Sequence, residues 1–370
     1  MSIQKRGKSY YVRYRRDGQH LGRSFARKED AEKFELDQKR VRQLGAHAPG
    51  TPSRDTLGQW LDQWWALQSP VWAESTRVQR KHSLDKWVRP YIGKVRLYDL
   101  GTKRVGEWRS EILADGASAS VVNHAAAYLS AALGHAVKLG DLPANPCRML
   151  DTLPTIVERP QVLTPEQVEK VAAAMLTDRD RVLTYLIAYA GLRPGEALAI
   201  TWDDVTDHLL IVDKSWSYGK LKRTKTEKRR TVEIVAPLGR DLAAYRPARV
   251  ERGALVIPNA DGGHLEINNW RNREWARAAE KAGTTATPYD LRHSFASLLI
   301  HEGRSVPVVA ALMGHSRPST TLDTYSHEFH AHRLGTGVVM VDAIETARRG
   351  VLKTCSPASV KRLRQFAPGA

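Results

Sequence analysis

The chain has 370 residues, 42% of them hydrophobic, and its 57 Lys and Arg against 40 Asp and Glu give a formal net charge of +17. This length predicts two or three domains, and the charge favours nucleic acid as a partner over its rival, an anionic membrane surface. No apolar run of about 18 residues is present, so we expect no membrane-spanning helix. The segment MSIQKRGKSYY also lacks the apolar core of a secretory signal.

Several motifs of common enzyme classes are missing from the sequence. It contains no CxxC, no HExxH and no GxxxxGK[ST], so neither a metal site nor nucleotide hydrolysis is indicated and no cofactor is expected. The two cysteines, Cys147 and Cys355, lie far apart. That pattern fits a reducing, intracellular setting.

Residues 1–45 form a basic unit with 13 Lys or Arg against 6 Asp or Glu. Residues 10–15 are β-prone, Asp-Gly at 17–18 is typical of a two-residue hairpin turn, and a second strand is predicted over 21–25. A helix is expected over 28–43. A small sheet with one helix is therefore predicted.

The function of this basic unit has two interpretations. It is either a solvated β-unit or a DNA-binding module, and the interleaved Arg and Tyr of its strand favour phosphate contact. The side chains that we expect to contact DNA are Lys5, Arg6, Arg13 and Arg15.

Residues 46–54 are predicted to be a linker, and residues 55–152 to be a helical bundle. Leu57, Trp60, Leu61 and Trp64 recur at helical spacing, and these tryptophans are more typical of a core than of a ligand platform. A cationic face, which either contacts DNA or keeps the bundle soluble, carries Arg77, Arg80 and Lys81. A second linker is expected over 153–160.

The third domain is expected over residues 160–345, followed by a basic tail over 346–370. In the string GLRPGEALAITWDD, Pro194 suits the first position of a helix and places Arg193 at its N-cap. A helix start with a guanidinium suits phosphate binding, and Glu196 is placed to orient the arginine. A structural Arg–Glu pair in a tight helix-turn-helix is the equal alternative.

Period-two patterns over 208–212 and 231–235 predict two strands of a small antiparallel sheet. Between them, seven of the eleven residues in 220–230 are Lys or Arg. A basic segment at the tip of a hairpin is usually only solvated. Here, however, we expect Lys222 and Arg223 to contact DNA. Lys225 is placed to protonate a departing alkoxide, a step that such groups accelerate by roughly 10²–10⁴-fold.

Two further strings carry the remaining reactive residues. TPYDLRHSFAS contains Arg292 and His293, which are expected to begin a helix, with His293 structural at the edge of its apolar face. LMGHSRPSTTLDTYSH contains His315 at a helix end and Tyr325 on the next helix. A packed core tyrosine is the alternative for Tyr325 taken alone.

Together these strings resemble the tyrosine recombinase family, also called phage-type integrases. The resemblance is strongest over 160–330, and it extends to the family's core-binding domain and N-terminal arm-binding domain. It implies a multidomain α+β fold with a β-sheet plus helix, an all-α bundle and a mostly α catalytic domain. The residues that match the family's catalytic pattern are Arg193, Lys225, Tyr289, Arg292, His315 and Tyr325.

Tyr289 departs from the family pattern, which usually has His and sometimes Lys at that position. A tyrosine hydroxyl still donates a hydrogen bond, but it carries no positive charge at neutral pH. We therefore predict that Tyr289 contacts the scissile phosphate or braces Arg292.

The resemblance also implies an activity without metal or ATP. Tyr325 is expected to attack a DNA phosphorus and expel a 5′-hydroxyl, leaving a 3′-phosphotyrosine, with Lys225 as general acid. A homotetramer is expected to exchange strands of double-stranded DNA at core sites through a Holliday junction while the N-terminal unit holds arm sites. A host DNA-bending protein and an excision factor are possible partners, and the location is expected to be the cytoplasm of a bacterial host.

Two other functions remain open. One is a type IB topoisomerase that uses the same chemistry without strand exchange, against which the arm-like unit and the linker argue. The other is a DNA-binding regulator that kept the fold and lost the activity. The presence of every expected side chain except at Tyr289 argues against the regulator.

Overall fold

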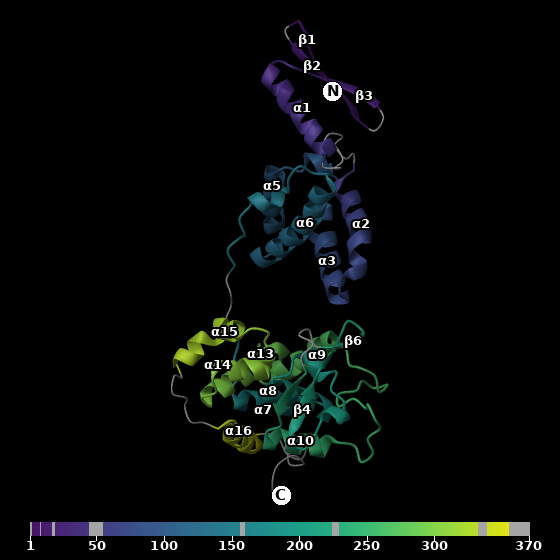
Figure 1. The fold of residues 1–370 in the computed structure, drawn as a ribbon. Helices are drawn as coiled ribbons and strands as arrows, with labels where there is room; N and C mark the ends of the chain where they lie inside the picture. The colour runs from purple at the N-terminus through teal and green to yellow at the C-terminus, as the bar shows by residue number, and fades with distance from the viewer. Residues whose placement is uncertain are drawn as a thin grey trace. The chain divides into compact units, whose positions relative to one another are not determined.

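The computed structural model describes residues 2–7, 9–16, 19–43, 55–155, 160–223, 229–331 and 339–354. The chain divides into two compact units, Met1–Val157 and Glu158–Ala370, whose elements are labelled in Figure 1. Within the described ranges, no helix is both long enough and apolar enough to cross a membrane.

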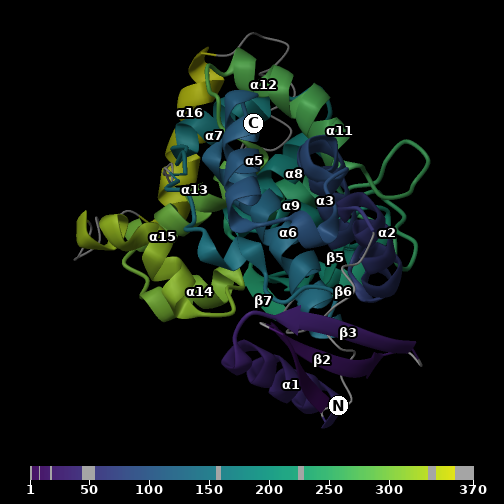
Figure 2. The ribbon, with the colours of Figure 1, turned by 90° about the horizontal axis from the view of Figure 1, so that it is seen from above.

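The first unit begins with a small antiparallel sheet and one helix: β1 (Ser2–Arg6), β2 (Ser9–Arg16), β3 (Gln19–Phe25) and α1 (Lys28–Gln43). Helix α1 lies along one face of this sheet (Figure 2). Val12 and Ala31 are fully buried at the contact, and the rings of Tyr14 and Phe34 meet edge to face with centroids 5.3 Å apart. The predicted two-stranded hairpin therefore has a third strand, β1, and the helix begins where the sequence places it.

The rest of the first unit is a helical bundle with three 3-10 turns: α2 (Leu57–Gln68), η1 (Ser69–Val71), α3 (Glu74–Trp87), α4 (Arg89–Ile92), η2 (Leu97–Asp99), α5 (Thr102–Ala114), α6 (Ala119–Leu139) and η3 (Pro146–Met149). Thr56 caps α2 in a capping box with Gln59, and Ser118 caps α6. Gly140 ends α6 in the left-handed conformation with φ 87°. As the periodicity indicates, Trp60 is buried in the core of this bundle.

The second unit is mostly helical: α7 (Pro165–Ala174), α8 (Asp178–Ala190), α9 (Pro194–Ala197), η4 (Trp202–Asp204), β4 (Leu209–Val212), β5 (Lys214–Ser217), β6 (Lys220–Arg223), β7 (Arg230–Glu233), α10 (Ala236–Tyr245), α11 (Ile267–Trp270), the π-helix η5 (Arg271–Trp275), α12 (Ala276–Lys281), α13 (Pro288–His301), α14 (Val306–Met313), α15 (Pro318–Ala331) and α16 (Met340–Thr354). Helix α8 is buried along most of its length and packs against α13. Helices α14 and α15 pack against each other and against α13 (Figures 1 and 2).

Three sequence expectations differ from this structure. The strands predicted over 208–212 and 231–235 pair antiparallel as β4 and β7, but a second two-stranded sheet, β5 with β6, lies between them. Helix α13 begins at Pro288 rather than at Arg292, because Thr287 and Asp290 form a capping box there.

The boundary expected between residues 345 and 346 falls inside α16. This helix continues because Arg348 anchors it to the core. Its guanidinium donates to Asp241 Oδ2 at 2.6 Å and to Glu169 Oε1 at 2.9 Å. Both carboxylates are buried, so Arg348 supplies the cation that they would otherwise lack in the core.

Candidate active site

Arg193 lies at the start of α9, where the sequence places it. Helix α8 ends at Gly191 in the left-handed conformation, and Pro194 opens the next helix. The Arg193 backbone N–H and its Nη1 each donate to the Glu196 carboxylate at 2.9 Å. The other guanidinium nitrogen, Nη2, donates to the Gly314 carbonyl at 2.9 Å. Residues that are far apart in sequence therefore hold this arginine in a fixed position.

Glu196 is the anionic centre of the site. Its side chain is 2% exposed, and Arg230 donates to both of its oxygens, at 3.0 and 2.7 Å. Burial would raise the pKa of Glu196, but the hydrogen bonds and charges of Arg230 and Arg193 outweigh it and lower that pKa to about 2. Arg230 was not among the predicted site residues, because its only signal in the sequence is its place at the end of the basic run.

Arg292 completes a cluster of three guanidinium groups. It is 1% exposed and donates to the backbone carbonyls of Gly191 and Met313. Its Nη1 lies 3.9 Å from Glu196 Oε2. Burial and then the charge of Arg193 lower its pKa to about 10, so it stays protonated at neutral pH. Three cations around one carboxylate leave an excess of two positive charges, which suits an anionic ligand.

His315 follows the left-handed Gly314 at the end of α14. Its Nδ1 lies 2.7 Å from the hydroxyl oxygen of Thr321, which is fully buried on α15. Burial, followed by the charges of Arg292 and Arg193, lowers the pKa of His315 to about 4, so the imidazole is neutral at pH 7. When Thr321 donates to Nδ1, the ring proton is on Nε2.

Tyr325 lies on α15 and is 1% exposed. Its hydroxyl contacts Nδ1 of His293, and burial raises its pKa well above the usual value. The sequence assigned His293 a structural role on an apolar face, whereas the structure places it against the expected nucleophile. Tyr289 is 48% exposed, and its ring meets that of His293 edge-on with centroids 5.5 Å apart.

The structure thus brings together five of the six residues expected to be catalytic. Lys225 lies outside the described residues, as does the side chain of Arg223. Lys222 is half-buried on β6. Within the described ranges, no cluster of three or more His, Cys, Asp and Glu is placed to hold a metal ion.

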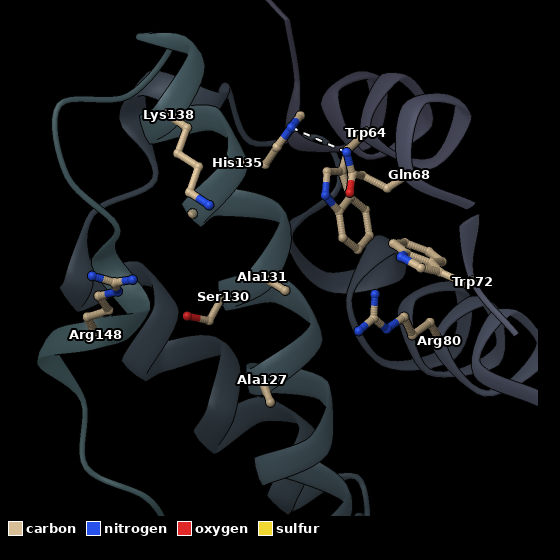
Figure 3. Close-up of a pocket in the computed structure, with 11 residues that line it drawn as sticks. Trp64, Gln68, Trp72, Arg80, Ala127, Ser130, Ala131, His135, Lys138 and Arg148 are labelled. Atoms are coloured by element: carbon tan, nitrogen blue, oxygen red, sulfur yellow. Dashed lines mark hydrogen bonds between the residues drawn. The ribbon is translucent and has the colours of Figure 1, made fainter. Parts of the chain in front are cut away.

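A second cationic feature is a pocket of about 460 Å³ in the helical bundle. The Arg80 guanidinium lies 4.2 Å above the Trp72 ring and 5.6 Å from the centre of Tyr128. Figure 3 shows Arg80 next to Trp72 on one side of the pocket, with Lys138 and Arg148 on the other. Among the described residues that line it, none is a carboxylate, so the pocket is positively charged.

The other side chains expected to contact DNA are less distinctive. Arg77 and Lys81 form surface ion pairs with Glu74 at 3.6 Å and with Asp85 at 3.0 Å. Such exposed pairs are typical of a solvated helix.

In the N-terminal sheet, Arg13 is exposed on the face opposite Val12, whereas Lys5 pairs with Tyr10 and lies on the α1 side. These two expected contacts therefore do not share a face. The side chains of Arg6 and Arg15 lie outside the described residues.

Comparison with known proteins gives the same family for both units. Residues 161–332 match the phage integrase family, and residues 56–113 match the N-terminal SAM-like domain of phage integrases. The tyrosine recombinase XerD of Mycobacterium tuberculosis is 36% identical over 191 residues, which cover 48% of this chain and 58% of the relative. The ICEBs1 integrase of Bacillus subtilis is 26% identical over 269 residues, covering 67% of this chain and 72% of the relative. The chain thus spans little more than half the length of XerD.

Solved structures show the same fold. A Tn1549 transposon integrase in complex with a circular intermediate DNA superposes with a TM-score of 0.63 at 19% identity, covering 76% of this chain and all of that one (100%). A lambda integrase dimer bound to a COC′ core site gives a TM-score of 0.61 at 21% identity, covering 87% of this chain and 94% of that one. With both units matched and all six of the expected catalytic residues inside the longer match, this chain belongs to the phage integrase family of tyrosine recombinases.

Proposed function

We propose that this protein is a site-specific DNA recombinase that cleaves and rejoins DNA through a 3′-phosphotyrosine and integrates a phage or mobile element. The observation that carries the proposal is the cationic cluster of Arg193, Arg230 and Arg292 around Glu196, adjacent in the fold to the hydroxyl of Tyr325. A nucleophile next to a fixed anion site is the arrangement that phosphoryl transfer requires.

The charge of the cluster matches the reaction. A phosphodiester carries one negative charge, and its pentacoordinate transition state carries about two, so an excess of two positive charges favours the transition state over the ground state. Arg193 and Arg292 are held by backbone carbonyls and need little rearrangement when the phosphate binds. A proton on His315 Nε2 supplies one more donor without adding charge.

In the proposed step, the Tyr325 oxygen attacks phosphorus and the 5′-oxygen departs with a proton from Lys225. Arg292 and Tyr325 are both 1% exposed, so a phosphate reaches them only when neighbouring side chains move. Tyr289 is half-exposed and its ring packs against His293, which in turn contacts Tyr325, and this supports our prediction that Tyr289 contacts the scissile phosphate.

DNA binding is proposed for two surfaces. The pocket with Arg80, Lys138 and Arg148 would hold core-site DNA, because these cations face one cavity without a carboxylate among its described lining residues. The exposed Arg13 face of the N-terminal sheet would hold arm sites. A lambda integrase has been solved as a tetramer bound to a Holliday junction, which supports the proposal of a tetramer here.

The decisive experiment uses a core-site substrate with a nick that traps the covalent intermediate. We expect the wild-type protein to become attached to DNA and Tyr325→Phe to bind the same DNA without attachment. An adduct with Tyr325→Phe would refute the assignment of the nucleophile. Failure of the wild type to attach would favour a regulator, and attachment to DNA without a requirement for two specific partner sites would favour a topoisomerase.

A further inference from the structure

We propose that His293 is a further catalytic residue, which accepts the phenolic proton of Tyr325 as its oxygen attacks the DNA phosphorus. The inference rests on the proposed function and concerns the same site. It comes from one contact across two helices: Nδ1 of His293, on α13, meets the Tyr325 hydroxyl, on α15.

The geometry around this contact suits proton transfer. The two rings are 5.6 Å apart between centroids, and Tyr289 packs on the His293 ring from one turn earlier in α13. Tyr325 is 1% exposed, so bulk water is in a poor position to take its proton. Asp290, another base on α13, is engaged as the capping partner of Thr287, with Oδ2 accepting at 2.7 and 2.8 Å.

The ionisation state of His293 also suits an acceptor. Burial lowers its pKa from 6.5 and the charge of Arg292 adds to this, while Asp290 opposes both. The imidazole is therefore neutral at pH 7, with a lone pair available on Nδ1 when the ring proton is on Nε2. The titratable groups around it are Tyr289, Asp290 and Arg292 on α13, Tyr325 on α15 and His315 after α14.

In the proposed step, each bond that forms is matched by a bond that breaks. The O–H bond of Tyr325 breaks and its proton passes to Nδ1 of His293, while a new bond forms between the phenolic oxygen and phosphorus. The bond from phosphorus to the 5′-oxygen breaks, and that oxygen takes a proton from the general acid, proposed to be Lys225. In the rejoining step, the His293 imidazolium returns its proton to the departing phenolate, so both half-reactions use it.

The test measures single-turnover attachment to the nicked core-site substrate by His293→Gln and His293→Ala. Glutamine keeps most of the volume and can still accept the phenolic hydrogen bond, but it cannot take the proton. We expect both variants to bind DNA like the wild type and to attach roughly 10²–10⁴-fold more slowly. We also expect the wild-type rate to fall with an inflection below pH 6.5 that His293→Gln lacks.

A matched control and a second substrate make the result specific. Glu328→Gln alters another group whose charge acts on Tyr325, and we expect it to attach at close to the wild-type rate. A substrate with sulfur at the bridging 5′ position needs no general acid, so it should rescue Lys225→Ala but not His293→Gln.

Three outcomes would overturn the proposal. The first is wild-type or faster attachment by His293→Gln, which would make the contact a restraint on the nucleophile. The second is full rescue of His293→Gln by the sulfur substrate. The third is a loss of attachment rate in Glu328→Gln as large as that in His293→Gln. Melting curves show whether each of the two His293 variants folds. If one of them does not fold, the attachment rate of the other decides. If the wild type attaches and Tyr325→Phe does not, the proposed function stands whatever His293 does.

Discussion

At the scale of single residues, Glu196 links stability to function. It pairs with Arg193 and Arg230, which also form the anion site. Its folded pKa of about 2 lies below the ordinary 4.5. A lowered folded pKa gives stability that is complete above pH 4.5 and is lost as the pH falls towards 2.

We therefore expect Glu196 to contribute about 3 kcal/mol to unfolding free energy at pH 7, and this contribution to decline below pH 4.5. Urea unfolding at pH 7, 4 and 3 checks this, with Glu196→Gln as the comparison. The variant should be less stable at pH 7, and the difference from the wild type should shrink as the pH falls. An unchanged difference between pH 7 and pH 3 would contradict the assignment.

Thr321 is a second residue with an indirect role, since its hydroxyl fixes the ring of His315 at 2.7 Å. We expect Thr321→Val, which keeps the shape and loses the hydrogen bond, to slow covalent attachment about 10-fold, the equivalent of about 1.4 kcal/mol. Thr321→Ser keeps the hydroxyl and should stay close to the wild-type rate. Equal rates for the two variants would show that the bond does not matter to the chemistry.

Sequence patterns located some of these residues and not others, for a physical reason. Arg193 and His315 lie next to helix boundaries, which Pro194 and Gly314 mark in the sequence. The positions of these two residues in the fold can therefore be predicted from their immediate neighbours. Arg230 acquires its role through Glu196, 34 residues away. Thr321 and His293 likewise depend on how α14, α13 and α15 pack, which no local spacing encodes.

At the scale of elements, a stacked cation in the bundle pocket links α3 to Trp72, which follows η1, and to Tyr128 on α6. Arg80, on α3, is held over the Trp72 ring, whereas Lys81 is exposed and paired with Asp85. A guanidinium fixed on an indole needs less ordering when it meets a phosphate than a mobile lysine does.

We expect Arg80→Ala to weaken binding to core-site DNA about 10-fold. The slope of the logarithm of the binding constant against the logarithm of the salt concentration should fall in magnitude by about one. Lys81→Ala is the matched control and should change binding little. Titrations at several salt concentrations, followed by fluorescence anisotropy, measure both. If Lys81→Ala weakens binding as much as Arg80→Ala, the pocket has no special part in recognition.

Elements with strong local signals were predicted well. Helix α1 spans the residues 28–43 that the sequence predicts, and the periodic apolar residues of α2 lie in the core of the bundle. The hairpin of β5 and β6 was missed because the basic run over 220–230 obscures the period of two in β6, so its partner strand β5 has no visible mate in the sequence. Helix α16 crosses the boundary expected between 345 and 346 because Arg348, which looks like a tail charge in the sequence, pairs with Glu169 and Asp241.

At the scale of the whole molecule, the three expected domains imply a separation of tasks. The domain boundaries stay predictions, but the N-terminal sheet has a buried core of its own with Val12 and Ala31. Its removal should therefore leave the catalytic cluster unchanged, since Arg193, Arg292 and Tyr325 all lie in the second unit.

We expect a chain without residues 1–50 to cleave core-site DNA at close to the normal rate and to fail in integration. Covalent trapping on the core site measures the first property, and a two-plasmid integration assay measures the second. Normal integration by the shortened chain would remove the arm-binding role. Loss of cleavage as well would show that the N-terminal unit supports the chemistry.

The left-handed glycines at 191 and 314 determine how this site tolerates mutation. Their main-chain oxygens hold Arg292 and Arg193, and an exchange of neighbouring side chains does not remove a main-chain oxygen. A methyl group at either position is a different matter: it would lie 2.2 Å from Phe295 Cδ1 or 2.9 Å from Arg230 Nη1. Substitution of the side chains that flank Gly191 and Gly314 should therefore be tolerated more readily than substitution of the two glycines themselves.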